Sequence, residues 1–342
     1  MIKLYIIEDN HFVCICLKAK IMFDIITIGT ATQDIFLKSE QFKSRSDESV
    51  KTGKAMVFEA GSKMEIDEII SDTGGGATNC AVTFARLGLE TATCFSLGRD
   101  AAGREIRRVL KKEGISTRII TQRTHEPTSL SIILLGPSGE RTVLVHRGSL
   151  IKSPDLILDK IATKWVYISS VGGNLELLEK IATYARSRNI KLAFNPGSGE
   201  LKLGLKRLFP ILEATTILVL NRAEASQLMG LPYSFRKTVV RQACGLTPGI
   251  EVITDGKDGA CVISEGQSYS IGVYDWPLVD RLGAGDAFGS GFVGGYIKYQ
   301  DITKALQYAA ANASSVVTKI GAKAGIIKAF PKKPLKVEIQ KI

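Results

Sequence analysis

The sequence predicts an α/β protein with a doubly wound, mostly parallel sheet and a small inserted β-sheet that forms a lid. Short, nearly all-apolar segments rich in β-branched residues recur along the chain, which is typical of parallel strands buried on both faces. Helical stretches separate these segments, and polar residues or glycines follow them. Two ribbon-like stretches interrupt this alternation and predict the inserted sheet. Ligands of such folds bind at the carboxyl edge of the parallel strands, so we expect the functional residues there.

Four segments carry the buried-strand pattern. The first begins after Phe23, covers residues 24–29 and ends at a glycine. The other three are residues 192–194, 216–220 and 251–254, and each follows a helical stretch. Because helices alternate with these strands, we expect one domain over residues 23–330.

The two ends of the chain lie outside this pattern. Residues 1–22 contain an apolar run, 12–17, that is too short for a secretion signal and follows an acidic pair. We treat residues 1–22 as an N-terminal extension without an assigned role, either an extended start or an appended strand. Residues 331–342 are expected to form a basic C-terminal tail.

The two ribbon-like stretches are residues 36–73 and 125–147. The second contains two strand-like runs joined by the turn sequence Gly136-Pro137-Ser138-Gly139. We interpret both as lid segments, because many active sites need to be closed against water. Surface hairpins without a role are the alternative.

Composition excludes several classes of protein. No window approaches the ~18 uninterrupted apolar residues of a membrane helix, so we expect a soluble protein without a membrane partner. Six scattered cysteines, no CxxC pair and three histidines indicate neither a zinc site nor a disulfide framework. Reduced thiols favour a cytoplasmic location.

The formal net charge of +11 raises the question of nucleic-acid binding. Part of this charge lies at the chain end, where residues 328–342 hold five lysines and one glutamate. The rest is spread over the body without a basic and aromatic cluster, which is typical of a solvated surface. We therefore expect an anionic small-molecule partner and no nucleic acid.

The strongest local signal is the run from Asp280 to Gly291, DRLGAGDAFGSG, which leads into a predicted helix. Gly283, Ala284 and Gly285 are small enough for their N–H groups to converge on an anion at the positive end of the helix dipole. Four glycines inside the helix would each cost about 1 kcal/mol relative to alanine, so they predict close contact with a neighbour or ligand.

Asp286 stands where that anion would bind, and its charge would repel ATP. A general base removes this conflict, because a carboxylate that takes a proton from a substrate hydroxyl becomes neutral as the oxygen attacks the γ-phosphorus. We therefore predict Asp286 as the catalytic base. A plain N-terminal helix cap is the alternative.

A second glycine run, residues 74–76, leads through Asn79 into another predicted helix. It is not a dinucleotide fingerprint, because Asn79 occupies the place of the third glycine, and the chain has no P-loop GK[ST]. A glycine-lined wall with the Asn79 amide facing a polyhydroxylated ligand is the functional interpretation. A purely steric turn is the alternative.

Two further strand ends carry polar residues. Asn221 and Glu224 lie on the first turn of a predicted helix, and their oxygens suit Mg²⁺, which usually takes only one or two protein groups. A capping box is the alternative. Residues 254–259 form a strand end and a turn, consistent with a loop beneath a nucleotide or with an ordinary turn.

In this order, the motifs resemble the ribokinase-like (PfkB-type) carbohydrate kinase family over about residues 24–325. The N-terminal signature corresponds to Gly75-Gly76 with Asn79, followed by residues 85–88 and 98–103. The C-terminal signature corresponds to residues 280–288. The resemblance implies an ATP-dependent sugar kinase with a β-sheet lid, which in many members also builds a dimer contact.

The resemblance also implies a role for individual residues. The base is Asp286, and Gly283, Ala284 and Gly285 form the anion hole. The sugar hydroxyls are held by Asp34, Gly75, Gly76, Asn79 and, in the lid, Glu140. The nucleotide and its phosphates are served by Asn195, Asn221, Thr254, Gly256 and Asn312. The metals are Mg²⁺ at Glu224, through water, and K⁺ at Asp280.

One departure from the family pattern affects both the expected K⁺ site and the expected substrate. Most members read Asp-Thr-Thr before the GAGD run, whereas this chain reads Asp280-Arg281-Leu282. An arginine at the position of Arg281 is also found in relatives that resemble 2-keto-3-deoxygluconate kinases. The expected acceptor is therefore a ribose-, fructose- or 2-keto-3-deoxygluconate-like sugar. A nucleoside kinase on the same fold and a non-catalytic sugar- or nucleotide-binding protein are the alternatives.

Overall fold

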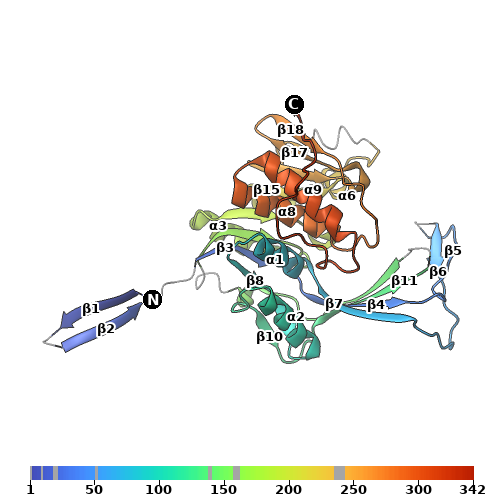
Figure 1. Ribbon diagram of the computed structural model, residues 1–342, viewed down its shortest axis with the longest axis horizontal. Helices are drawn as coiled ribbons and strands as arrows, with labels where there is room; N and C mark the ends of the chain where they lie inside the picture. The colour runs from blue at the N-terminus through green and yellow to red at the C-terminus, as the bar shows by residue number, and fades with distance from the viewer. Residues whose placement is uncertain are drawn as a thin grey trace.

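The computed structural model describes residues 2–8, 11–17, 22–50, 53–137, 141–156, 162–234 and 243–342. A nine-stranded sheet forms the body of the described chain, with helices on both faces (Figure 1). Its strands, in order across the sheet, are β19 (Glu338–Lys341), β18 (Gln267–Ile271), β17 (Ala260–Ser264), β16 (Ile250–Thr254), β15 (Ile217–Asn221), β14 (Lys191–Phe194), β13 (Ala162–Ile168), β3 (Met22–Ile28) and β8 (Thr91–Cys94). The strands from β16 to β8 are parallel, and the other three are antiparallel. The predicted fold class is confirmed.

Alternate residues of the parallel strands face two separate cores, because side chains of a strand point to opposite faces in turn. Ile26 and Ile28 belong to the core under one helix layer, whereas Ile25 belongs to the core under the other. The first layer contains α3 (Leu175–Ser187), α4 (Ser198–Leu201), α5 (Leu205–Leu212) and α6 (Arg222–Met229). The second contains α1 (Gly76–Arg86), α8 (Ala284–Tyr299) and α9 (Ile302–Val316), and α2 (Ala101–Lys112) packs beyond α1. Burial on both faces explains why these strands are almost entirely apolar.

The glycines inside α8 are sites of close packing, as predicted. An added Cβ at Gly291 or Gly295 would lie about 3 Å from the backbone of α9. At Gly294 it would meet Leu87 just beyond α1, and at Gly289 it would meet the side chains of the sheet. Backbone contact with neighbouring elements therefore offsets the low helix propensity of these residues.

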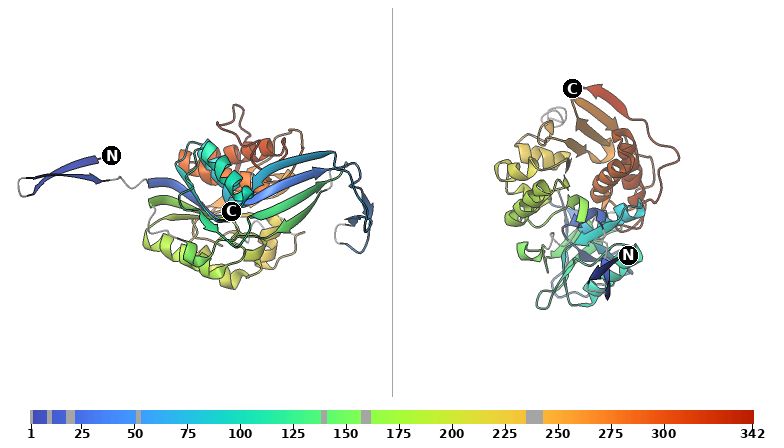
Figure 2. Two further views of the ribbon diagram at one scale, coloured as in Figure 1. Left: turned by 90° about the horizontal axis from the view of Figure 1, so that it is seen from below. Right: turned by 90° about the vertical axis from the view of Figure 1, so that its left-hand side faces the viewer.

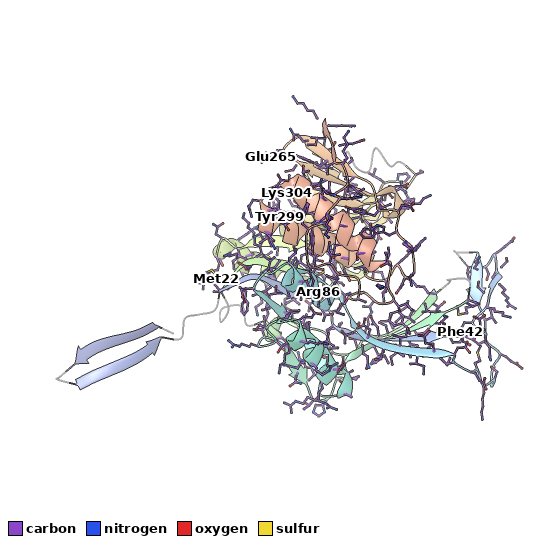
Figure 3. All side chains as sticks on the ribbon, viewed as in Figure 1. Met22, Phe42, Arg86, Glu265, Tyr299 and Lys304 are labelled. Atoms are coloured by element: carbon purple, nitrogen blue, oxygen red, sulfur yellow. The ribbon has the colours of Figure 1, made fainter. Side chains whose placement is uncertain are left out.

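The lid is a separate four-stranded sheet that projects from one end of the body (Figures 1 and 2). Its strands, in order, are β12 (Arg141–His146), β11 (Ser129–Leu135), β4 (Thr32–Lys38) and β7 (Glu68–Gly74). At its far end, near the small ribbon of β5 (Ser44–Ser46) and β6 (Lys54–Met56), Phe42 packs edge-on against Phe58 (Figure 3). These strands fall within or next to the predicted lid segments.

The remaining elements lie at the periphery. Strands β1 (Ile2–Glu8) and β2 (His11–Leu17) of the N-terminal extension pair with each other and with no other described strand. Strand β9 (Ser96–Gly98) pairs with β10 (Thr121–Arg123). The basic tail adds β19 to the edge of the main sheet, which the sequence did not predict. Within the described residues, no helix has the length and apolar character needed to cross a membrane.

Candidate active site

A cavity of about 250 Å³ opens at the carboxyl edge of the parallel strands, where the sequence places the functional residues. Residues that follow or end five neighbouring strands contribute to its wall, and the starts of α1, α6 and α8 complete it. Its lining is Thr30, Gly76, Ser169, Ser170, Asn195, Pro196, Gly197, Val219, Leu220, Asn221, Glu224, Thr254, Gly285 and Asp286.

Asp286 lies in the first turn of α8 and faces the cavity. Its Oδ2 accepts a hydrogen bond of 2.8 Å from Nδ2 of Asn79 on α1. Burial raises the pKa of the Asp286 carboxyl, while the Asn79 bond and the charge of Lys323 oppose the rise and Asp34 adds to it. A carboxylate with a raised pKa beside a cavity is suited to accept a proton from a bound hydroxyl.

The backbone before Asp286 forms a tight turn into the helix. Gly283 has a left-handed φ of 77°, and an added Cβ would lie 2.4 Å from Cβ of Ala322, so only glycine fits. The amide of Ala284 donates to the carbonyl of Arg281 at 3.3 Å. The amides of Gly285 and Asp286 have no intrahelical acceptor in the first turn. The amides of Gly285 and Asp286 are therefore the ones left open at this turn, and Gly283 shapes the turn.

The glycine wall on α1 brings that helix close to the base. Gly75 has a φ of 93°, and an added Cβ at Gly76 would lie 2.8 Å from Cβ of Ser169 and 3.5 Å from Oδ1 of Asp286. Asn79 is 5% exposed, and its Oδ1 is buried without a hydrogen-bond partner in the described chain. This free acceptor beside the base is a suitable place for a ligand hydroxyl, because buried polar atoms rarely stay unsatisfied.

Asn195, Asn221, Glu224 and Thr254 also line the cavity. Asn221 Oδ1 accepts from the amide of Glu224, and Glu224 Oε2 accepts from the amide of Asn221, both at 2.8 Å. The capping box therefore forms, yet both residues also line the cavity. Burial and the charge of Asp286 raise the pKa of the Glu224 carboxyl, so a cation here would relieve the repulsion.

Eight of the described residues that the sequence predicts for the site do not line this cavity: Asp34, Gly75, Asn79, Gly256, Asp280, Gly283, Ala284 and Asn312. Asp34 is 6% exposed and accepts from Thr32 Oγ1 at 2.8 Å, although its charge still acts on Asp286. Asn312 is fully buried, because its amide joins α8 to the C-terminal segment through Ala287 and Ile327. Gly256 begins the short helix η3 (Gly256–Asp258) without reaching the cavity. Glu140 lies outside the described residues.

Asp280 is held by the lid. Its Oδ1 forms an ion pair of 2.9 Å with Arg141 at the start of β12, and also accepts from the amide of Leu282. Its Oδ2 accepts from the amide of Gly321. Sequence reasoning missed Arg141, because nothing in the local pattern joins two residues so far apart in the chain.

Sequence reasoning also missed Lys323, which lies in the C-terminal segment. It is 5% exposed, and its Nζ donates to the carbonyl of Thr73 at the end of β7. Burial lowers the pKa of its amine to about 8, against the opposing charges of Asp72, Asp34 and Asp286. Its place in the run GAKAG gave no sign of burial, since isolated lysines are mostly exposed.

The donor set fits one of the two expected cations. The described residues contain no group of three or more His, Cys, Asp or Glu side chains that could hold a metal. Mg²⁺ needs only one or two carboxylates when phosphates and waters supply the other ligands, so Glu224 fits it. K⁺ does not fit at Asp280, because the guanidinium of Arg141 already neutralises that carboxylate.

A doubly wound sheet with a carboxylate of raised pKa and a turn of open amides at its carboxyl edge is typical of an enzyme that acts on a small molecule. The model of the pfkB family of carbohydrate kinases matches residues 22–329. The chain belongs to this family and is an ATP-dependent sugar kinase.

One curated relative and two solved structures illustrate the similarity, and the two structures show a common fold. A ribokinase of Haemophilus influenzae is 27% identical over 260 residues, which cover 74% of this chain and 83% of that protein. The crystal structure of Methanocaldococcus jannaschii nucleoside kinase matches with a TM-score of 0.73 and 23% identity, covering 90% of this chain and 95% of that chain. Arabidopsis thaliana ribokinase, complexed with ribose and ATP, matches with a TM-score of 0.73 and 20% identity, covering 90% and 96%.

Proposed function

We propose that this protein transfers the γ-phosphoryl group of ATP to a hydroxyl of a ribose-, fructose- or 2-keto-3-deoxygluconate-like sugar, with Asp286 as the general base. The observation that carries the proposal is the position of the Asp286 carboxylate. It faces the cavity, is oriented by Asn79, and stands beside the free amides at the start of α8. Asp286 takes the proton of the acceptor hydroxyl as its oxygen forms a bond to the γ-phosphorus and the bond to the ADP oxygen breaks.

The two ends of the cavity have different partners. Asn195, Asn221 and Thr254 face the nucleotide, with Gly256 in the adjoining turn and the amides of Gly285 and Asp286 toward the transferred phosphate. Glu224 holds Mg²⁺ through water, and the metal, when bound, neutralises charge on the phosphate oxygens.

The sugar enters from the lid side. Gly75 and Gly76 let it approach the backbone, and the unsatisfied Oδ1 of Asn79 accepts one of its hydroxyls. Asp34 binds a second hydroxyl once a sugar displaces its bond to Thr32. The lid closes over this end and excludes water, which protects the transferred group from hydrolysis.

The fold does not choose between a sugar and a nucleoside as acceptor, because a ribokinase and a nucleoside kinase match it with the same TM-score. We favour a sugar because the family model is that of carbohydrate kinases. The lid supports a homodimer, since edge strand β12 exposes Val143, Leu144 and Val145. Cys80, Cys94, Cys244 and Cys261 are free thiols, which supports a cytoplasmic location.

A screen of ATP consumption against ribose, fructose, 2-keto-3-deoxygluconate and adenosine tests the proposal. Turnover should be found with at least one of the three sugars and should require Mg²⁺ without depending on K⁺. Turnover with adenosine alone would favour the nucleoside kinase. Absence of turnover with every acceptor, in protein that still binds ATP, would support a non-catalytic binding protein.

A further inference from the structure

The base of the lid contains two carboxylates that face each other. Asp34 on β4 and Asp72 on β7 are direct cross-strand partners in the antiparallel pair. Like charges at opposed positions of a sheet destabilise it. Asp286 adds a third carboxylate on the core side. The charge of Asp34 repels that of Asp286 and raises the pKa of the Asp286 carboxyl. A site that depends on Asp34 and Asp286 as anions therefore needs a positive charge between them.

Lys323 supplies this charge from a fixed position. Arg86, labelled in Figure 3, donates to the carbonyl of Lys323 at 3.0 Å and to that of Ile326 at 2.9 Å. The guanidinium of Arg86 is itself held by Glu113 at 2.6 Å. The Lys323 ammonium donates to the Thr73 carbonyl, beside Asp72 in sequence. Both ends of the lysine are thus tied down, one to the core and one to the lid.

We propose that Lys323 is a positioning residue for this kinase: its ammonium holds the sugar-side carboxylate Asp34 and the base Asp286 in their ionised, fixed arrangement and joins the lid to the core. This inference rests on the proposed role of Asp286. The groups whose charges act on the ammonium are Asp34 on β4, Asp72 on β7, Asp286 on α8 and the thiol of Cys80 on α1. Of these the carboxylates favour the charged lysine, and burial opposes it.

The charge of Lys323 should limit activity on the alkaline side. The pKa of the buried amine is about 8, below its ordinary value of 10.5. As the pH rises through about 8, the ammonium is lost, Asp34 and Asp72 repel each other, and turnover falls. Folding stability changes in the other direction. Because the folded lysine has the lower pKa, the unfolded chain binds more protons in this window, so this group makes stability rise with pH between about 8 and 10.5. If the ammonium had only a structural role, turnover and folding stability would not change in opposite directions as the pH rises.

The experiment compares the pH profiles of kcat and kcat/KM for the wild type, Lys323→Met, Asp72→Asn and a matched control, Lys319→Met. Lys319 is an exposed lysine four positions earlier in the same segment, so its variant should overlay the wild type. Lys323→Met should lose the alkaline limb. Its acid limb should move up by about one pH unit, because the cation that lowers the pKa of Asp286 is gone. On the acid side kcat/KM should fall about tenfold.

Asp72→Asn tests the same charge without changing Lys323. Asp72 raises the pKa of the lysine, so its removal should move the alkaline limb to lower pH. Melting curves for every variant establish folding. If Lys323→Met does not fold, the double variant Lys323→Met with Asp72→Asn, which also removes the opposed charge, takes its place.

The outcomes separate the two proposals. A wild type with normal turnover and no alkaline limb near pH 8, or a Lys323→Met profile that is lower but not shifted, overturns the role of Lys323 and leaves the proposed function intact. If the alkaline limb of Asp72→Asn lies at the same pH as that of the wild type, the role of Lys323 is also overturned. A wild type without turnover on any acceptor overturns the proposed function, and the inference with it.

Discussion

The central sheet and the lid sheet are stabilised in different ways. In β15 of the central sheet, Ile217, Leu218 and Leu220 have no exposed surface, and helices cover both faces. In β12 of the lid every residue is exposed. Apolar burial on both faces therefore fixes the central sheet, whereas the outer strand of the lid is open to solvent and contacts the core through the ion pair of Arg141 with Asp280. The difference teaches that the lid side of the site borders a strand open to solvent, whereas the cavity itself lies at the end of strands packed on both faces.

The largest effect is expected where the two regions meet. Asp286→Asn should lower kcat by at least ~10²-fold, the low end for loss of a general base, while ATP binding persists on the rigid side. Asp301→Asn is the control, because Asp301 caps α9 through the amide of Lys304 and lies outside the cavity. Near-normal turnover of Asp286→Asn would rule out Asp286 as the base.

A smaller effect is expected from an added methyl group in the wall of the cavity. Gly76→Ala should lower kcat/KM about tenfold, since the Cβ would lie 2.8 Å from Ser169 and forcing a side chain into packed space costs about 1–3 kcal/mol. Gly272→Ala is the matched change, because its Cβ meets nothing within 4 Å and the residue lies outside the cavity, so the protein should melt at the same temperature and keep its turnover. Equal melting temperatures and equal kinetics for both variants would contradict the close approach at Gly76.

Loss of the ion pair between Arg141 of the lid and Asp280 of the core should have a still smaller effect on activity. Arg141→Met should raise the KM for the sugar about fivefold and leave that for ATP unchanged, because a partly exposed pair contributes up to about 1 kcal/mol. Arg147→Met, an exposed arginine just after β12, is the control. A parallel rise in both KM values would mean that Arg141 does not act on the sugar side alone.

The smallest effect is expected at the edge of the central sheet. Removal of residues 338–342 deletes β19, whose four residues are all exposed. The melting temperature should fall by about 2 °C and turnover should not change, because little apolar surface is lost at this edge. Loss of turnover in this truncated chain would show that the basic tail supports the site.

Much of the fold could be predicted because it follows from local patterns. The apolar segments gave the parallel strands, and the glycine runs gave the starts of α1 and α8. The positions of Asp286, Asn221 and Glu224 at one cavity follow from the rule that parallel strands end at the same edge.

The contacts of Arg141, Lys323 and Asn312 could not be predicted in this way. Each joins residues distant in sequence, and a single chain carries no record of such pairs. Asn312 illustrates the limit, because the same amide suits a nucleotide pocket and a buried link between helices. Only its full burial in the structure distinguishes the two.

The contact between Ala322 and Gly283 has a consequence for how the protein is made. Ala322 packs on the turn before the base, and the next residue, Lys323, carries the ammonium that faces Asp286. Proteins fold from their N-terminal parts as they emerge from the ribosome. Both sheets except β19 are synthesised before these two residues appear. A nascent chain therefore lacks the contacts of Ala322 and Lys323 with the proposed catalytic centre until this segment has been synthesised.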